Sequence, residues 1–260
     1  MDLIDCHAHL AWDIDDGIQS EEDALKALQN AYKDGIYKII ATPHFVPCEY
    51  SDFQFKQGNE RIDLLRDMAK PLGIQIYRGC EMMLNWRYLE MLKNKEYNTL
   101  AESDYILVEF DVRRDISNIS EADDRLYELT IRGLKPLIAH VERYFHGRID
   151  LDRVKKWIDM GCYIQVNRTS LMGLQGDRNR FNASALIYNG LAHVVASDTH
   201  RAEGSRICKL SDAYKEIQKE YGLEQAEILL SRNPMHIINN ETLETIEVQK
   251  NFFRKLGKKR

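Results

Sequence analysis

Histidine and carboxylate residues recur in short motifs along this 260-residue chain, which has only eight histidines. The first motif is "DCHAHLAWDIDDG", residues 5–17, in which His7 and His9 are separated by one residue. Side chains alternate between the two faces of a strand, so both imidazoles of such a pair point to the same side. Asp198 and His200 in "SDTH" repeat this spacing. Nitrogen and oxygen donors placed in this way indicate a metal site.

The cysteines do not contribute to this donor set. They are five in number, scattered along the chain without a CxxC pair, which favours neither a disulfide framework nor a thiolate zinc site. The segment from Cys162 to Arg168, "CYIQVNR", matches the C-x5-R pattern of cysteine-dependent phosphatases. However, strand-like residues without glycine occupy the place of the tight phosphate-binding loop. Cys162 is therefore rejected as a nucleophile.

Seven short runs rich in Val, Ile and Tyr are predicted to be strands, and most precede a longer segment of helical period. They cover residues 3–9, 37–44, 74–81, 105–110, 135–142, 162–167 and 192–200. Helix signals between them include Ser20 as an N-cap with Gly35 as a stop, and Gly161 as the stop of the helix that begins near residue 150. This alternation is typical of a parallel α/β fold.

Six of the seven runs end in His, Asp or Glu, namely His7, His9, His44, Glu81, Glu109, His140, Asp198 and His200. In a closed parallel barrel the carboxyl ends of the strands meet on one face, where functional residues lie. With an aspartate of "DIDDG", these residues offer too many ligands for one ion, so two or three ions are predicted. A mixed nitrogen and oxygen set without thiolate suits Mn, Fe or Zn.

Hydrolysis of a phosphate ester is the predicted chemistry. Clustered metal ions lower the pKa of bound water and clamp the attacking and leaving oxygens of a phosphoryl transfer. Arg143 lies three residues after His140, and Arg206 follows "SDTH", with Arg201 as a competitor for the same role. A guanidinium group matches phosphate oxygens in a bidentate way and stays charged, so two of these arginines are expected to bind the phosphoryl group.

Composition and charge limit the number of domains and the classes of binding partner. The chain is 44% hydrophobic and 30% charged, which favours a single domain, predicted over residues 1–250, with a basic tail at 251–260. The net charge is −5 although the last seven residues carry five positive charges, so the rest of the chain is strongly acidic. An acidic chain disfavours nucleic-acid binding. The sequence shows neither an apolar run of about 18 residues, which a membrane-spanning helix needs, nor the pattern of a signal peptide. The predicted location is therefore the cytoplasm. The tail is interpreted as a solvated end or a contact with an acidic partner or membrane surface.

Seven motifs, in this order and over nearly the whole chain, resemble those of the polymerase-and-histidinol-phosphatase (PHP) superfamily. They read "DCHAHLAWDIDDG", "ATPH", "GCE", "LVEF", "IAHVERY", "DMGCYIQVN" and "ASDTH". Within it the chain is most similar to the manganese-dependent protein-tyrosine phosphatases of bacterial capsule and exopolysaccharide operons, the CpsB/CapC/YwqE-like family. The parts that point to this branch are "DIDDG" and "IAHVERY", because histidinol phosphatases commonly have histidine at the positions of Asp16 and Glu109.

The resemblance implies a distorted (β/α)7 TIM-like barrel with three divalent metal ions, with Mn²⁺ favoured and Fe or Zn as alternatives. The ligands of the first ion would be His7, His9, Glu81 and Asp198. Glu81 would bridge to a second ion, completed by Glu109 and His140. The third ion would be bound by Asp16, His44 and His200. Asp16 is preferred to Asp15 because it directly precedes Gly17.

The implied mechanism is attack on phosphorus by a metal-bridging hydroxide without a phosphoenzyme, with Asp198, His200, Arg143 and Arg206 as the catalytic residues. The implied substrate is the phosphotyrosine tail of a membrane-associated bacterial tyrosine kinase, which would bring the enzyme close to the membrane. Arg113 and Arg114 would bind the acidic peptide that surrounds the phosphotyrosines, or else lie on a solvated face. The aromatic loop 45–55 either flanks the phosphotyrosine ring or packs on the barrel or on a neighbouring subunit.

Other readings stay open at this point. The main alternative is a PHP phosphatase acting on histidinol phosphate or another small metabolite. An alternative of another class is a metal-dependent regulator without turnover. The sequence also leaves the oligomeric state open, a homo-oligomer included.

Overall fold

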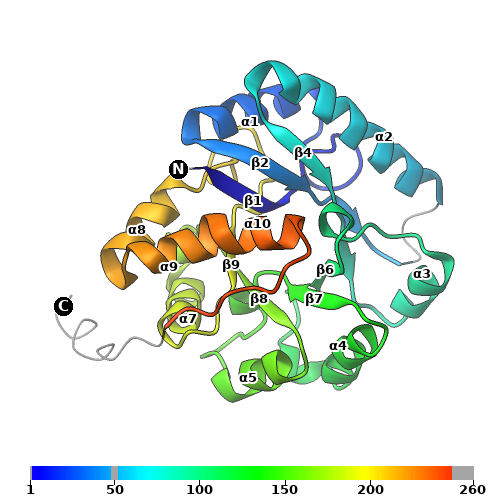
Figure 1. Ribbon diagram of the computed structural model, residues 1–260. Helices are drawn as coiled ribbons and strands as arrows, with labels where there is room; N and C mark the ends of the chain where they lie inside the picture. Colours follow the sequence, from blue (N-terminus) through cyan, green and yellow to red (C-terminus); the bar gives the residue numbers. More distant parts are fainter. Residues whose placement is uncertain (1, 48–51, 248–260) are drawn as a thin grey trace.

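A curled sheet of parallel strands with helices on its outer side forms the centre of the protein (Figure 1). The computed structural model describes residues 2–47 and 52–247, so the predicted basic tail lies outside the described residues. The strands are β1 (Leu3–Ala8), β2 (Ile36–Ala41), β3 (His44–Phe45), β4 (Gln75–Arg78), β5 (Glu81–Met83), β6 (Tyr105–Glu109), β7 (Lys135–Ile138), β8 (Tyr163–Asn167) and β9 (Val194–Ala196).

The strands follow one another around a barrel-like ring. Ladders join β1-β2-β4 and β3-β5-β6-β7-β8-β9, and every pair is parallel. The first and last strands meet beside the histidine pair, where the Asp198 amide donates to the His7 carbonyl and the His9 amide to the Thr199 carbonyl, both at 2.9 Å. The predicted α/β barrel class is therefore confirmed.

Two of the seven predicted runs are interrupted. Thr42 and Pro43 separate β2 from β3, and Pro43 has no amide hydrogen for a ladder. Gly79 and Cys80 separate β4 from β5. A Cβ atom at Gly79 would lie 2.8 Å from Cγ2 of Ile40, so only glycine allows this close approach. The barrel is distorted at these two positions.

Helices alternate with the strands, as predicted. They are α1 (Glu21–Asp34), α2 (Asp52–Ala69), η1 (Lys70–Leu72), α3 (Tyr88–Asn94), η2 (Leu100–Glu102), η3 (Ile116–Asn118), α4 (Ala122–Thr130), η4 (Val141–Arg143), α5 (Leu151–Asp159), α6 (Arg168–Leu171), α7 (Asp177–Tyr188), α8 (Ser211–Tyr221), α9 (Leu223–Glu227), η5 (Ile228–Arg232) and α10 (Asn233–Ile238). The Ser20 side chain accepts from the Asp23 amide, and Gly35 ends α1 with φ 83°. These cap predictions are confirmed, as is Gly161 just beyond α5 with φ 95°.

Strand alternation divides the apolar side chains between two clusters. In β6, Ile106 and Val108 belong to the larger, outer cluster, which also contains helix residues. The inner cluster contains Ile4, Cys6, Ile40, Leu100, Tyr105, Leu107, Leu137, Ala139, Val194, Ala196, Ile237 and Leu243. Because β6 places Tyr105 and Leu107 in the inner cluster, the next residue on that face is Glu109. Carboxylates at strand ends are thereby directed toward the barrel axis.

The helical run from α9 to α10 covers the amino ends of the strands. The Asn233 amide group donates to the carbonyl of His193, which directly precedes β9, at 2.8 Å. The Ser231 hydroxyl donates to the carbonyl of Asp2, which precedes β1. With this end covered, the opposite, carboxyl end of the strands is the face where a site can open. No helix in the described part of the chain is long and apolar enough to cross a membrane.

Candidate metal centre

All nine predicted ligands meet at the carboxyl ends of the strands. Seven of them, together with Arg143 and Arg206, line one cavity of about 700 Å³. The other two, His7 and His9, lie deeper and are fully buried. The structure thus brings together side chains that are up to 193 residues apart in the sequence, from His7 to His200.

The deepest part of the cluster joins β1 to β5 and to the segment after β9. His7 Nε2 lies 3.0 Å from His9 Nε2, so the two imidazoles do point to the same side. Glu81 Oε2 lies 3.1 Å from His7 Nε2 and 3.2 Å from His9 Nε2. Asp198 Oδ1 lies 3.5 and 3.6 Å from the same two nitrogens. Four side chains therefore direct donor atoms to one point.

The outward nitrogens of the two rings have their own partners. His7 Nδ1 donates to Gln165 Oε1 at 3.1 Å, and His9 Nδ1 donates to Asp15 Oδ2 at 2.8 Å. Neutral rings fixed in this way present lone pairs at both Nε2 atoms, which face each other. A cation must lie there or one ring must be protonated. Burial lowers the pKa of His7, but Glu81 and Asp198 outweigh it and raise that pKa to about 9.

A second group surrounds Glu81. Its Oε1 lies 2.9 Å from His140 Nε2, and its Oε2 lies 3.1 Å from His44 Nδ1. Glu109 is 3.0 Å from His44 Nδ1 and 3.8 Å from His140 Nε2. Burial and the neighbouring Glu81 raise the pKa of Glu109 to about 7. Two neighbouring buried carboxylates such as Glu81 and Glu109 repel each other unless a cation or a proton compensates the charge.

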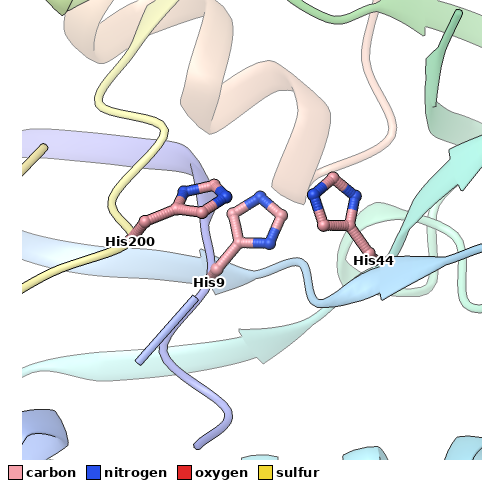
Figure 2. Close-up of side chains that lie close together, drawn as sticks. All are labelled: His9, His44 and His200. Carbon is pink, nitrogen blue, oxygen red and sulfur yellow. The ribbon is translucent and has the colours of Figure 1, made fainter. Parts of the chain in front are cut away.

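The third group contains His9, His44 and His200, whose rings lie close together in Figure 2. Their ring centroids are 4.4 Å apart for His9 and His44 and 4.0 Å apart for His9 and His200. Asp16 Oδ1 lies 3.3 Å from Nε2 of both His44 and His200. His9 is thus shared between this group and the deepest one, and the distances do not divide the nine residues into three separate sets.

Asp15 and Asp16 have different environments. Asp16 lines the cavity and is exposed, whereas the Asp15 side chain is buried behind His9. Asp15 accepts from the His44 amide at 2.7 Å and from the Gly17 amide at 2.8 Å, in addition to the His9 ring. Burial raises the pKa of Asp15, but His9 outweighs it and lowers that pKa to about 2. The geometry therefore favours Asp16 as the ligand and gives Asp15 the task of orienting His9.

Two candidate ligands adopt a backbone conformation that side chains rarely take. His140 follows β7 with φ 34°, and Asp198 follows β9 with φ 52°. For a residue other than glycine, this left-handed region costs on the order of 1–3 kcal/mol and is typical of functional sites. The strain turns the chain so that both side chains point into the cluster.

Like the two aspartates, the three candidate arginines differ in whether they line the cavity. Arg206 Nη2 donates to both Asp198 oxygens, at 2.9 and 3.0 Å, and Arg143 Nη1 to Asp198 Oδ2 at 3.4 Å. Arg201 instead donates to the backbone carbonyls of Asp16, Gly17 and His200 and does not line the cavity. Of the two arginines considered for the same role, Arg206 lines the cavity and Arg201 does not.

Other residues considered in the sequence lie outside the cluster. His146, His193 and His236 belong to none of the groups of candidate ligands. Cys162 is buried, and the residues between it and Arg168 form strand β8, as predicted. Burial raises the pKa of Cys162 to about 12, and Arg168 pairs with Asp212 at 2.6 Å. No phosphate-binding loop exists between the two residues.

Sequence reasoning did not identify Gln165 and Asn167 on β8, the one predicted strand without an ionisable end. Gln165 Oε1 accepts from the His7 ring and, at 2.9 Å, from the His140 amide. Gln165 Nε2 donates to Asn167 Oδ1, and Asn167 Nδ2 donates to Asp198 Oδ2 at 2.6 Å. Their alternation on the strand is a signal that was present in "YIQVN", where both amides fall on one face.

The residues present fit a group of divalent metal ions. Buried His44 Nδ1 and Glu81 Oε2 lie 3.1 Å apart but make no aligned hydrogen bond, which is the expected state of ligand atoms that face a cation. The donors are imidazole nitrogens and carboxylate oxygens, with outer hydrogen bonds that fix two of the rings. Such a set suits first-row metals such as Mn, Fe and Zn.

A parallel barrel with histidines and carboxylates gathered at the carboxyl ends of its strands has the architecture of TIM-barrel-like hydrolases. A family model described as "Capsular polysaccharide synthesis, CpsB/CapC" matches residues 3–239, and the chain belongs to this family. It is 33% identical over 248 residues to the tyrosine-protein phosphatase CpsB of Streptococcus pneumoniae, which covers 93% of this chain and 100% of that relative.

Solved structures agree with this assignment. One, from work on YwqE of Bacillus subtilis and CpsB of Streptococcus pneumoniae, described as unique metal-dependent tyrosine phosphatases, aligns with a TM-score of 0.83 and 26% identity. The alignment covers 96% of this chain and 99% of that one. A β-aspartyl dipeptidase of Fervidobacterium islandicum aligns with a TM-score of 0.58 and 12% identity, covering 90% and 72% of the two chains, which shows a shared fold only.

Proposed function

We propose that this chain is a metal-dependent protein-tyrosine phosphatase. The observation that carries the proposal is the convergence of nine histidine, aspartate and glutamate side chains at one end of the barrel, where seven of them line a cavity together with two arginines. Family membership and the names of the relatives support the same activity. The ligands we propose for three divalent ions, with Mn²⁺ favoured over Fe and Zn, are His7, His9, Asp16, His44, Glu81, Glu109, His140, Asp198 and His200.

The chain's own groups have distinct tasks in this proposal. When bound, divalent ions lower the pKa of water and so supply a nucleophile at neutral pH. Arg143 and Arg206 bind the phosphoryl oxygens through charge-assisted hydrogen bonds, since both guanidinium groups already lie within 3.4 Å of Asp198 at the cavity. Asp15 and Gln165 keep His9 and His7 in the tautomers that leave Nε2 free. No side chain of the site has to form a phosphoenzyme.

The substrate we propose is the phosphotyrosine tail of a membrane-associated bacterial tyrosine kinase that regulates capsule or exopolysaccharide synthesis. The family's connection with capsular polysaccharide synthesis supports this choice. Dephosphorylation of such a tail would take place in the cytoplasm, near the membrane that holds the kinase.

The test is a phosphatase assay of chelated protein to which Mn, Fe, Zn or Co is added back, with a phosphotyrosyl peptide and histidinol phosphate as substrates. We expect turnover only with metal and preference for the peptide. A strong preference for histidinol phosphate would instead make the chain a small-molecule phosphatase, and no turnover of either would favour a regulator.

Matched variants locate the chemistry within the same assay. His200→Ala and Arg143→Ala are expected to lower kcat on the order of a hundredfold, as loss of a charge-stabilising group does in other enzymes. The controls are His236→Ala, at the other end of the barrel, and Arg148→Ala, an exposed arginine that does not line the cavity. Cys162→Ser should also retain activity. Equal rates for His200→Ala and the unchanged protein would contradict the site.

A further inference from the structure

Trp86 lies at the mouth of the metal cavity and is the most exposed of the three tryptophans. Its relative exposure is 77%, whereas Trp12 and Trp157 are 5% and 0% exposed. It lines the same cavity as Glu81, His140 and Arg143. An indole is the largest apolar side chain, so its exposure beside a cluster of charged groups makes a large aromatic surface available to a ligand in the cavity.

The loop that carries Trp86 is held firmly. The Leu84 amide donates to the Glu109 carbonyl at 2.8 Å, and the Leu84 carbonyl accepts from Arg125. Asn85 Nδ2 donates to the Pro47 carbonyl at 3.0 Å, while Asn85 Oδ1 accepts from the Arg87 amide at 2.9 Å. The exposure of the indole is therefore a property of an anchored loop, which begins just after the metal-facing strand β5.

The surroundings of Trp86 suit a flat apolar group attached to an anion. Leu84, Val112 and Ile119 line the same cavity, and the Arg87 guanidinium carbon lies 5.1 Å from the centroid of the Trp86 ring. Arg143 and Arg206 provide positive charge beside Asp198. The cavity of about 700 Å³ lies within the range of small-molecule sites and leaves room for more than a phosphoryl group.

We propose that Trp86 is a specificity-determining residue that packs against the aromatic ring of the substrate's phosphotyrosine. This inference rests on the proposed phosphatase activity and adds the element that separates aryl from alkyl phosphates. The metal cluster and the arginines recognise the phosphoryl group, which both classes share. The indole recognises what only the aryl class has.

The kinetic test compares two phosphate monoesters, a phosphotyrosyl peptide and glycerol phosphate, with the metal-loaded protein. Because an aromatic pair contributes a factor of about ten at most beyond area burial, Trp86→Ala should lower kcat/KM for the peptide by about five- to tenfold, mainly through KM. The rate with glycerol phosphate should be unchanged. Trp86→Phe should restore most of the loss. Tyr127→Ala, which removes an exposed aromatic ring outside the cavity, is the matched control.

A second readout does not depend on turnover. Since the other two tryptophans are buried, quenching of fluorescence by acrylamide reports mainly on Trp86. A peptide with a non-hydrolysable phosphonate in place of phosphotyrosine should protect this fluorescence, whereas inorganic phosphate should not. The same peptide lacking the phosphonate should protect only weakly.

The outcomes separate this inference from the proposed function. If the unchanged protein does not hydrolyse the peptide, the proposed function is wrong. If it does, but Trp86→Ala lowers both substrates equally or neither, and the phosphonate peptide gives no protection, the role of Trp86 is wrong. A change in oligomeric state of Trp86→Ala with unchanged selectivity would assign the indole to an interface and would also overturn the proposal.

Discussion

Gln165 connects three of the nine candidate ligands to one another. Its side chain bonds to the ring of His7, to the backbone of His140 and, through Asn167, to Asp198. An amide is suited to this position because it accepts and donates at once without titrating. The ligands are therefore oriented by a neutral group that adds no charge to an already charged cavity.

We expect Gln165→Leu to weaken Mn²⁺ binding by about 10- to 100-fold, the usual effect of losing an outer partner of a metal-binding histidine. Gln165→Glu keeps the acceptor for His7 and His140 and should lose less. Titration of the chelated protein with Mn²⁺ measures both. If Gln165→Leu binds Mn²⁺ as tightly as the unchanged protein, the orienting role is wrong.

Gly17 lies so close to the site that it tolerates no side chain. A Cβ atom there would be 2.4 Å from Cβ of His9 and 2.7 Å from Oδ1 of Asp15. Gly17→Ala must therefore displace both residues, and a shift of about 1 Å at a reacting geometry costs about a hundredfold in rate. We expect kcat/KM to fall by that order, measured with the phosphotyrosyl peptide.

Gly58 in α2 provides the control for that substitution. A Cβ atom at Gly58 would meet its nearest neighbours, Ile14 and Pro43, at 3.8 and 3.9 Å, which is ordinary contact. Gly58→Ala should keep the rate and gain about 0.5–1 kcal/mol of stability, because glycine is unfavourable within a helix. Equal losses of activity in both variants would refute the specific role of Gly17.

At the scale of elements, His193 joins β8, β9 and the covering helical run. Its ring Nδ1 accepts from the Ile164 amide at 3.1 Å, and its own amide donates to the Ile164 carbonyl at 2.9 Å. Asn233 of α10 donates to its carbonyl. A histidine that accepts at Nδ1 in a buried position must stay neutral, and burial lowers the pKa of His193 to about 4.

This low pKa predicts acid destabilisation. The unfolded chain takes up a proton at His193 near pH 6.5, which the folded protein refuses until about pH 4. Stability is therefore complete above pH 6.5 and falls as the pH decreases toward 4, by on the order of 3 kcal/mol from this residue. His193→Asn keeps an acceptor near the Ile164 amide and does not titrate, so denaturant unfolding should show a flatter pH profile.

Particular residues show what the sequence could and could not predict. Glu109 and Asp198 were predictable because strand alternation and the rule of carboxyl ends place them on the barrel face. The bonds of Gln165 were not, because its partner His7 is 158 positions away and the local pattern of β8 contains no charge. The breaks after β2 and β4 depend on packing at Pro43 and Gly79, which periodicity does not reveal.

At the scale of the whole molecule, the candidate ligands lie in or shortly after six of the nine strands of the ring, namely β1, β3, β5, β6, β7 and β9. The ring closes between β1 and β9 through few backbone bonds, and His7, His9 and Asp198 lie at that junction. The carboxylates of Glu81 and Asp198 both lie against His7 at this junction, and their mutual repulsion works against closure of the ring in the absence of cations. Metal binding should therefore stabilise the entire barrel.

We expect saturating Mn²⁺ to raise the melting temperature of the chelated protein. At one hundred times Kd, binding adds about 2.7 kcal/mol, which corresponds to roughly 5–10 °C for a chain of this size. His200→Ala should reduce the shift, and His236→Ala should keep it. Calorimetry or a dye-based melt measures the change. A shift that is equally large in His200→Ala would place the metal elsewhere.

Three further cysteines share the burial described for Cys162. Cys6, Cys80 and Cys208 are also buried, and burial raises the pKa of each above the usual range. Peroxide reacts with thiolates, and these four side chains stay protonated as thiols at neutral pH, so they react with it very slowly. Phosphatases with a cysteine nucleophile are silenced when that thiolate is oxidised. Within residues 2–47 and 52–247, removal of phosphate from tyrosine by the metal cavity depends on no such sulfur, and these four cysteines do not make it sensitive to that form of oxidative control.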